Sequence, residues 1–391
     1  MTDTTTGIAE DMRLWRRDIH KHPELGFDED RTSGKVAGLL EDFGLEVHRG
    51  VGRTGVVGVL RKGSGNRAIG LRADMDALPI QEANDFEHRS VNDGVFHGCG
   101  HDGHTSMLLG AAKQLASAGD FSGTAYFIFQ PSEEDGRGAL AMIDDGLFER
   151  FPMEAVYGMH NMPGVPAGQF AVRAGAIMTS EDVFEITIQG RGGHASMPEK
   201  TIDPMVVGAE IVLALQTIPS RSIGPRDWCV VSVTEMLTDG ARNVIPSCVT
   251  IRGDCRALSL EVQATIERRM REIVAGIAAA HGAEGHVDYR NDFVPTINSG
   301  PETEAAIAAA QEVAGVEAVD PDCPTCGASE DFARMLRVKP GCYIFIGNGA
   351  DGDGRVCPSL HNPHYDLNDG ILANGRDFWV ALVEGQLAAG K

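Results

Sequence analysis

The chain is organised around one short stretch, which reads His97-Gly98-Cys99-Gly100-His101-Asp102-Gly103-His104. It places three imidazoles, a thiol and a carboxylate within eight residues, with glycines between them. Glycine permits sharp bends and left-handed backbone, so the stretch is typical of a loop that aims several side chains at one point. Imidazole, thiolate and carboxylate groups suit zinc and related divalent metals. The stretch therefore predicts part of a metal site, although a solvated polar loop would have the same composition.

Zinc normally takes three or four protein ligands, so further ligands must come from elsewhere in the chain. Polar side chains follow three predicted strands, each at the point where the strand ends. They are Asp74 and Asp76 after residues 68–73, Glu133 and Glu134 after 124–129, and His160 after 155–159. Because open α/β sheets bind ligands at the carboxyl ends of their strands, these side chains are site candidates. The aspartates also fit an ordinary turn, and the glutamates a solvated acidic turn.

Glu133 and Glu134 are adjacent, and neighbouring side chains do not point the same way. If both act, the economical division is one metal ligand and one general base. His20 and His22, near the end of a predicted helix over residues 9–20, could be ligands or could cap and pack that helix end.

Length and composition narrow the class of protein. A chain of 391 residues exceeds the size of a usual single core, so two domains are expected. The formal charge of −22 argues against a nucleic-acid or anionic-membrane partner, because both need basic patches. No apolar run approaches the ~20 residues of a membrane span, and the first six residues lack signal-peptide features. The eight cysteines are scattered, so we expect a reduced, cytoplasmic protein.

The first part of the chain, residues 1–177, combines predicted helices with buried strands. Helices are expected at 9–20, 32–43, 106–117 and 139–148, and residues 56–60 and 68–73 are predicted to form a strand pair. The fold class expected for this part is α/β.

From about residue 178 the elements follow the order βαββαβ, which is typical of a ferredoxin-like α+β domain. We therefore expect an inserted domain over 178–295, with the first domain resuming over 296–391. A glycine-rich loop carrying His194 follows the first strand of the insertion. The resumed part contains a predicted helix at 303–313, a strand at 342–347, a loop with His361, and a helix at 369–387.

Several motifs together resemble one enzyme family. The motifs are residues 71–79 (LRADMDALP), 98–104 (GCGHDGH), 130–134 (QPSEE), 158–160 (GMH), 193–198 (GHASMP), 243–246 (NVIP), 329–332 (SEDF) and 360–363 (LHNP). In this order they resemble the metal-dependent aminoacylase and carboxypeptidase-type amidohydrolases. The branch is the one that holds hippurate hydrolase and the plant indole-acetyl-amino-acid hydrolases.

The resemblance implies a zinc-peptidase-like catalytic domain, a smaller dimerisation domain, and two divalent ions per subunit, with zinc, manganese, cobalt or nickel as candidates. It implies metal ligation by five residues, namely Cys99, His101, Glu134, His160 and His361, with Glu133 as general base. Asp76 matches the aspartate that orients a metal-binding histidine in other branches, and Asp74 stands where that histidine would be. Whether Asp74, Asp102 or His104 contacts the metals stays open.

The resemblance also implies a homodimer or a dimer-based homotetramer, in which His194 reaches the partner's active site. An oxyanion needs a donor where charge develops, and His194 is the candidate, unless it only stabilises its glycine-rich turn. A substrate carboxylate needs an amide or guanidinium clamp, for which Asn243 and Arg256 are candidates. Arg256 could instead form a surface ion pair.

The expected activity is metal-dependent hydrolysis of the amide bond of a small N-acyl-L-amino acid. Hippurate, N-acetyl and indole-acetyl amino acids are the expected substrate types. A dipeptidase, a carboxypeptidase or an N-acetyl-diaminopimelate deacetylase would use the same site chemistry. A non-catalytic metal-binding protein on the same scaffold is the remaining alternative, although such a protein would need neither Glu133 nor His194.

Overall fold

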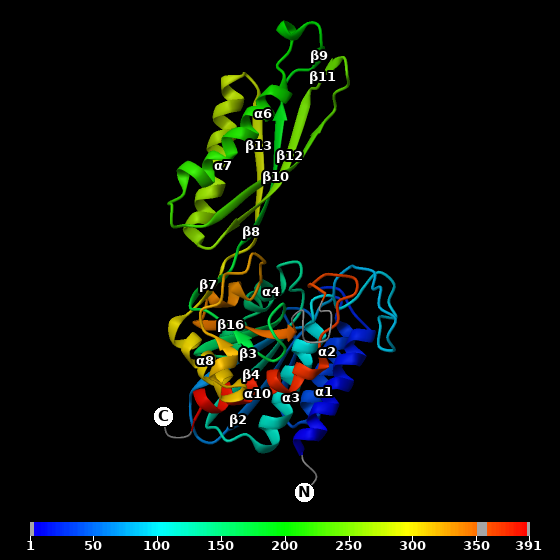
Figure 1. Cartoon of the computed structure of the whole chain (residues 1–391), viewed down its shortest axis with the longest axis vertical. Helices are drawn as coiled ribbons and strands as arrows, with labels where there is room; N and C mark the ends of the chain where they lie inside the picture. Colours follow the sequence, from blue (N-terminus) through cyan, green and yellow to red (C-terminus); the bar gives the residue numbers. More distant parts are fainter. Residues whose placement is uncertain (1–3, 350–357, 389–391) are drawn as a thin grey trace. The chain divides into compact units, whose positions relative to one another are not determined.

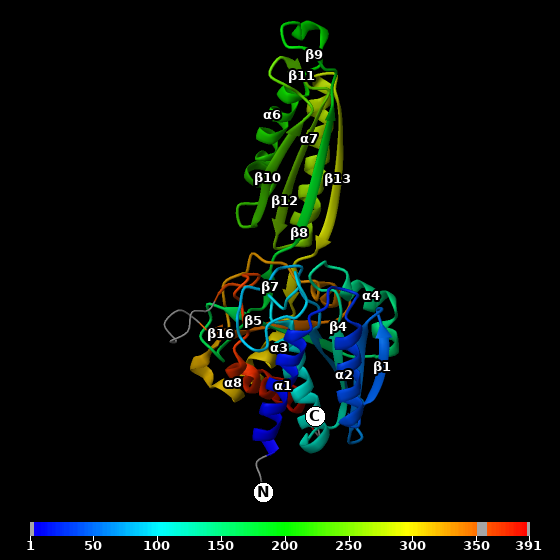
Figure 2. The same cartoon turned by 90° about the vertical axis from the view of Figure 1, so that its right-hand side faces the viewer.

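The computed structural model describes residues 4–349 and 358–388, and the chain divides into two compact units. The first unit comprises Met1–Ile177, Ile297–Pro324 and Asp331–Lys391, and the second comprises Met178–Thr296 and Thr325–Glu330. Figures 1 and 2 show a helix-covered large sheet in the first unit and a smaller sheet with two long helices in the second.

The first unit contains an eight-stranded mixed sheet with the order β1-β2-β4-β3-β5-β16-β6-β15. Its strands are β1 (Glu46–Val51), β2 (Gly55–Lys62), β3 (Ala68–Asp74), β4 (Gly123–Gln130), β5 (Ala155–Pro163), β6 (Phe170–Ala171), β15 (Val319–Asp320) and β16 (Gly341–Gly349). Strands β4, β3, β5 and β16 run parallel to one another. They are buried along almost their whole length, as expected for central parallel strands that are covered on both faces.

The helices of this unit are α1 (Thr4–Lys21), α2 (Asp30–Asp42), α3 (His101–Ala118), α4 (Gly138–Asp144), α5 (Leu147–Arg150), α8 (Gly300–Ala314), α9 (Ala333–Leu336) and α10 (Leu372–Gln386), with 3-10 turns η3 (Val316–Ala318) and η4 (Asp369–Ile371). Helix α3 packs against α1, α10 and β3, while α2 packs against β1 and β2. Aromatic side chains such as Phe127, Phe129 and Trp379 fill the core that these contacts enclose.

The predicted pairing of residues 56–60 with 68–73 is wrong. Both segments are strands, but β4 lies between them, antiparallel to β2 and parallel to β3. Local sequence identifies a strand by its apolar residues and turns, whereas the choice of neighbour is made by the whole sheet, and consecutive strands are often not neighbours.

The helix predicted from residue 106 begins five residues earlier, at His101. Gly100 precedes it in a left-handed conformation with φ 90°, and its carbonyl accepts hydrogen bonds from the backbone of Gly103 and His104. A Cβ at position 100 would lie 2.4 Å from Asn161 Nδ2 and 2.5 Å from the Tyr365 hydroxyl, so only glycine fits. The first turn of α3 is buried and carries the polar residues, which masks the usual amphipathic pattern.

The second unit has the predicted βαββαβ order. Its elements are β8 (Glu181–Gln189), β9 (Gly193–His194), η1 (Pro198–Lys200), α6 (Pro204–Leu215), the π-turn η2 (Ile218–Ser222), β10 (Cys229–Thr238), β11 (Val244–Ile245), β12 (Cys248–Ala257), α7 (Leu260–Ala280) and β13 (Glu284–Phe293). The antiparallel sheet has the order β10-β12-β8-β13, which is the ferredoxin-like arrangement. Alternate residues of β8 are buried beneath α6 and α7. Where the chain passes between the units, β7 (Gly175–Met178) pairs with β14 (Thr296–Asn298).

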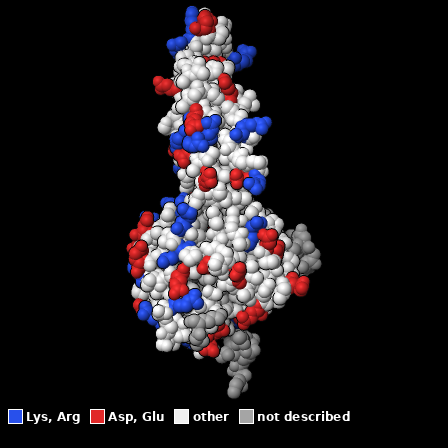
Figure 3. Space-filling view, turned by 90° about the vertical axis from the view of Figure 1, so that its left-hand side faces the viewer, with Lys and Arg blue, Asp and Glu red and all other residues white. Residues whose placement is uncertain are grey.

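Lysine and arginine side chains are interspersed with acidic ones over the face shown in Figure 3. Within the described residues, no helix combines the length and the apolar character needed to cross a membrane.

Candidate metal centre and active site

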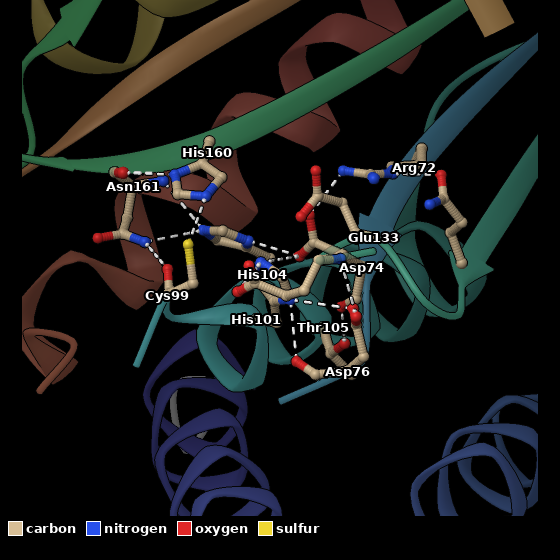
Figure 4. A network of polar contacts seen from close by, with 12 residues as sticks. Arg72, Asp74, Asp76, Cys99, His101, His104, Thr105, Glu133, His160 and Asn161 are labelled. Carbon is tan, nitrogen blue, oxygen red and sulfur yellow. Dashed lines mark hydrogen bonds and ion pairs between the residues drawn. The ribbon is translucent and has the colours of Figure 1, made fainter. Parts of the chain in front are cut away.

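The predicted ligands meet in the first unit. Glu134 follows β4 and His101 begins α3, whereas His160 lies inside β5, because this strand continues to Pro163 instead of ending at residue 159 as predicted. One group consists of Cys99, His101 and His160, whose ligand atoms all lie within 4.8 Å of one another. The sulfur of Cys99 is 3.3 Å from Nε2 of His160. Figure 4 shows these side chains converging from separate elements of the fold.

A second group shares the same thiol. Cys99, Glu134 and His361 also have ligand atoms within 4.8 Å of one another, and Nε2 of His361 lies 3.6 Å from the Glu134 carboxylate. His361 adopts φ 64°, a left-handed conformation that is uncommon for a residue with a side chain. Two of the candidate donor groups therefore share the Cys99 sulfur.

The chemistry of these residues fits a divalent metal. Nε2 of His101 is buried and has no hydrogen-bond partner within residues 4–349 and 358–388. Burial, together with the charge of Glu134, raises the pKa of the Cys99 thiol well above its usual range. A bound cation would reverse that effect, because it favours the thiolate. A sulfur, imidazole nitrogens and a carboxylate form a donor set that suits zinc and related ions.

Asp76 orients two of the candidate ligands. Its carboxylate Oδ1 lies 3.2 Å from Nδ1 of His101, and its backbone carbonyl lies 2.9 Å from the same nitrogen. Its other oxygen accepts a 3.0 Å hydrogen bond from the backbone N–H of Glu134. With Nδ1 as the donor, Nε2 of His101 keeps its lone pair for a metal. His160 Nδ1 likewise lies 2.6 Å from the carbonyl of Asn161.

His104 and Asp74 form a layer behind the ligands. Nδ1 of His104 is 2.7 Å from Oδ1 of Asp74, and its Nε2 accepts a 2.9 Å hydrogen bond from the backbone N–H of Asn161. Both nitrogens of His104 are therefore occupied. Burial opposes ionisation of Asp74, but His101, His104 and Arg72 hold its pKa well below the usual range. Asp74 lies close enough to His101 and His104 to form a further candidate donor group.

Asp102 lies away from the predicted ligands. Its Oδ2 is 2.9 Å from Nδ1 of His20 and 3.4 Å from Nη1 of Arg16. His20 is therefore packed in a buried charged network and is not among the candidate ligand groups, and the same network includes Glu82. Burial lowers the pKa of His20, but Asp102 and Glu82 outweigh it and raise the pKa to about 9.

Glu133, the predicted general base, is buried beside the ligands and forms a candidate donor group with His101 and Glu134. Its Oε1 accepts a 3.3 Å hydrogen bond from the backbone N–H of Asp331. Asp331 in turn lies 3.1 Å from Nη2 of Arg72, whose Nη1 donates a 2.6 Å hydrogen bond to Asp74. Glu133 thus lies at the edge of a buried charged network.

Sequence reasoning missed the roles of Arg72 and Asp331, although both lie in quoted motifs. Arg72 interrupts the apolar residues of β3, and a buried arginine needs a carboxylate partner. That rule could have predicted a partner, but not its position 259 residues later.

The second unit contains the other three predicted site residues. His194 is exposed on β9, opposite Val244 of β11, and the carbonyl of Asn243 accepts a 3.1 Å hydrogen bond from Ala195. Nδ1 of His194 also contacts the Ser196 hydroxyl at 2.8 Å. The structure therefore places His194 and Asn243 side by side within this unit.

Arg256 does not join that pair within the unit. It lies near the far end of β12, where its guanidinium contacts Glu181 at 2.8 Å and Asp254 at 2.9 Å. Eight residues of strand separate Cys248 from Arg256, or roughly 26 Å at ~3.3 Å per residue. Arg256 thus has the ion-pair arrangement that was the alternative to substrate binding.

Comparison with known proteins places this geometry in a family. Residues 70–385 match the family model described as peptidase family M20/M25/M40. The chain is 42% identical over 368 residues to the hippurate hydrolase of Campylobacter jejuni, covering 94% of each protein. It is 39% identical over 365 residues to the IAA-amino acid hydrolase ILR1-like 2 of Arabidopsis thaliana, covering 92% of this chain and 81% of that protein.

A solved structure has the same fold. The YXEP protein of Bacillus subtilis, described as a dinuclear metal binding peptidase from the M20 family, superposes with a TM-score of 0.85 at 30% identity. The alignment covers 98% of this chain and 99% of the other. From the matched motifs, the fold and these relatives, the chain belongs to peptidase family M20/M25/M40.

Proposed function

We propose that the protein is a metal-dependent amidohydrolase that cleaves N-acyl-L-amino acids into a carboxylic acid and a free amino acid. The observation that carries the proposal is the pair of donor groups joined at Cys99, with the Glu133 carboxylate beside them. The names of the hippurate and IAA-amino acid hydrolases support an acyl amino acid as the substrate class.

Two divalent ions would be held by the five predicted ligands, with Cys99 common to both donor groups, and zinc, manganese, cobalt and nickel are the candidates. Such ions supply Lewis acidity, which activates water and polarises an amide carbonyl. The support from a relative is the dinuclear description of the B. subtilis protein.

Glu133 would accept the proton of the attacking water and deliver it to the departing amine nitrogen. Its carboxylate lies beside the ligands, and its Oε1 accepts a hydrogen bond from the backbone N–H of Asp331. This hydrogen bond would orient the carboxylate that accepts the proton. Asp76 would keep His101 in the tautomer that exposes Nε2.

His194 would donate to the developing oxyanion, and Asn243 would contact the substrate carboxylate. The exposed position of His194 and its neighbour Asn243 suits a pair that acts on a ligand outside its own unit. A homodimer or dimer-based homotetramer with His194 acting on the partner subunit, a contribution from Arg256, and a cytoplasmic location stay predictions.

The test is release of free amine from a panel of hippurate, N-acetyl and indole-acetyl amino acids, with added zinc, manganese, cobalt or nickel. Glu133→Gln is the matched variant, because it keeps the side-chain volume but removes the base. We expect it to retain metal and to lose roughly 10²- to 10⁴-fold in kcat. Full activity of Glu133→Gln would exclude Glu133 as the base.

Dipeptides belong in the same panel, because the peptidase description of the B. subtilis protein favours them as the second candidate class. N-acetyl-diaminopimelate is included to test the predicted deacetylase alternative. Faster turnover of dipeptides than of all acyl amino acids would reassign the enzyme as a peptidase. A metal-loaded protein that releases no amine at high concentration would instead be a metal-binding protein.

A further inference from the structure

We infer that Glu29 is a positioning residue that holds the backbone turn carrying Glu133 and Glu134. The inference rests on the proposed function, because it assigns Glu29 an effect on the predicted base and on a predicted ligand. Glu29 lies outside every quoted motif, and it is separated from Ser132 by 103 residues.

Both oxygens of the Glu29 carboxylate accept hydrogen bonds from residues that are distant in the sequence. Oε1 accepts a 2.8 Å hydrogen bond from the backbone N–H of Ser132, and Oε2 accepts a 2.6 Å hydrogen bond from the Thr54 hydroxyl. The side chain is fully buried. A buried carboxylate with charge-assisted hydrogen bonds fixes the position of its donors more firmly than a neutral acceptor does.

Ser132 needs such support. It adopts φ 52°, a conformation that residues with a side chain rarely take and that persists only when the surroundings enforce it. Its carbonyl accepts a hydrogen bond from Gly138, its hydroxyl donates to Asp135, and a Cβ at Gly26 would lie 2.5 Å from that hydroxyl oxygen. The strained residue directly precedes the predicted base.

Glu29 is not needed for a local role in its own helix. It occupies the residue before α2, yet its side chain makes no capping hydrogen bond. The carboxylate of Glu24 instead accepts hydrogen bonds from the backbone of Arg31 at 2.9 Å and of Thr32 at 2.8 Å, in the first turn of α2. Helix capping is thus performed by Glu24, while Glu29 serves the distant turn.

The turn is held from its other end by Asp76, which accepts from the backbone N–H of Glu134. Two buried carboxylates therefore fix the residues on either side of Glu133. If the Glu29 contact is lost, Ser132 can relax toward ordinary backbone angles, and that rotation would redirect the Glu133 carboxylate and shift Glu134. Small displacements of a reacting group lower the rate strongly.

The ionisation of Glu29 predicts a pH dependence of kcat near neutral pH. Burial raises its pKa to about 7, and the Asp76 charge pushes in the same direction, while hydrogen bonds from Thr54, from Ser132 and from the backbone of Glu29 itself oppose them. The anionic form, which accepts both hydrogen bonds best, therefore loses population as the pH falls through about 7.

The experiment compares Glu29→Gln with Glu24→Gln in the full-length, metal-loaded protein. Both variants neutralise a glutamate near the start of α2, but only the first contacts the turn. Thr54→Val, which removes the second hydrogen bond, covers the case in which Glu29→Gln fails to fold. Each variant is assayed for kcat and KM against pH, and for the visible absorption spectrum of the cobalt-loaded protein without substrate.

We expect Glu29→Gln to lower kcat by about 10- to 100-fold with KM within about twofold of wild type. The acidic limb of the kcat profile should change shape, the cobalt spectrum should shift, and Thr54→Val should show a smaller change of the same kind. Glu24→Gln should lower only the melting temperature. Wild-type kcat, pH profile and cobalt spectrum in Glu29→Gln, or in Thr54→Val if the former does not fold, would overturn the inference.

The two proposals fail in different ways. Absence of amide hydrolysis by the wild-type protein contradicts the proposed function, and the cobalt spectrum then still decides whether Glu29 positions the Glu134 turn. A wild-type protein that hydrolyses the panel, combined with an unchanged Glu29→Gln variant, contradicts only the role of Glu29.

Discussion

Two neighbouring residues on the first turn of α3 belong to different clusters, which differ in how their charges are compensated. His101 belongs to the ligand cluster, which consists of Cys99, His101, Glu134, His160 and His361. Asp102 belongs to the ion-pair cluster, which consists of Arg16, His20, Glu82, Asp102, Asp366 and Asp369. Both clusters contain histidine and carboxylate side chains, so composition alone does not separate them.

The difference lies in how charge is compensated. In the ion-pair cluster, Arg16 and protonated His20 supply the cations that the surrounding carboxylates need. In the ligand cluster, the thiol, the imidazoles and Glu134 face one another, and the arginine next to them, Arg72, pairs with Asp74 and Asp331. A bound metal would add positive charge to the ligand cluster, whereas the ion-pair cluster already contains its cations.

The largest difference between the ion-pair cluster and the ligand cluster is expected in the free energy of unfolding. Asp102→Asn removes the buried carboxylate that Arg16 and His20 share, and breaking such a pair costs about 3–5 kcal/mol of the free energy of unfolding. The metal bound per folded molecule should stay within about a factor of two, since Asp102 is in no candidate donor group. Urea unfolding and elemental analysis measure both quantities. Loss of metal with an unchanged free energy of unfolding would mean that Asp102 belongs to the ligand cluster.

A second effect is alkaline loss of stability. The folded pKa of His20, about 9, lies above the usual value of 6.5, so its contribution is fully present below pH 6.5 and disappears as pH rises through about 9. This rise in pKa corresponds to about 3 kcal/mol. Urea unfolding at pH 6.5 and pH 9.5 should show this loss in the wild type and not in His20→Gln. Equal losses in both proteins would mean that His20 is neutral when folded.

The smallest effect on folding is expected in the ligand cluster. Cys99→Ser replaces a soft thiolate by a hydroxyl and should weaken zinc binding by at least roughly 10- to 100-fold, because loss of a group that only supports a ligand already costs that much. The unfolding free energy of the metal-free protein should change by less than about 1 kcal/mol, as for substitutions that remove no core volume. Competition with a chromophoric chelator measures the affinity, and unchanged affinity would remove Cys99 from the site.

Part of the site could be predicted because Glu134 lies just beyond the end of a parallel strand and His160 lies in the last half of another. Glu134 and His160 follow runs of β-forming residues, and the common edge of parallel strands brings such positions together. The ferredoxin-like order can also be predicted, because its elements are long and several of them, such as β8 and α7, are clearly periodic. His361 came only from the family resemblance, since its loop carries no regular pattern.

The remaining features could not be predicted, because most of them depend on contacts between residues that are far apart in the sequence. Arg16 meets Asp102 across 86 residues and Arg72 meets Asp331 across 259. Asp74 is a local partner of Arg72, but nothing local selects the distant acid among the 56 of the chain. The insertion of β4 between β2 and β3 is decided by the whole sheet. The early start of α3 was hidden because its first turn is buried on every side, which removes the amphipathic signal.

The left-handed glycine that opens α3 sets a limit on any attempt to redesign the metal preference. There is no room for a side chain at position 100, so Gly100, which joins Cys99 to His101, cannot be replaced by a larger residue. Cys99 directly precedes this glycine and His101 is the first residue of α3, so the spacing between the two predicted ligands is set at the start of the helix. A change of ion preference would therefore have to come from the other predicted ligands, among which His361 has the most exposed side chain.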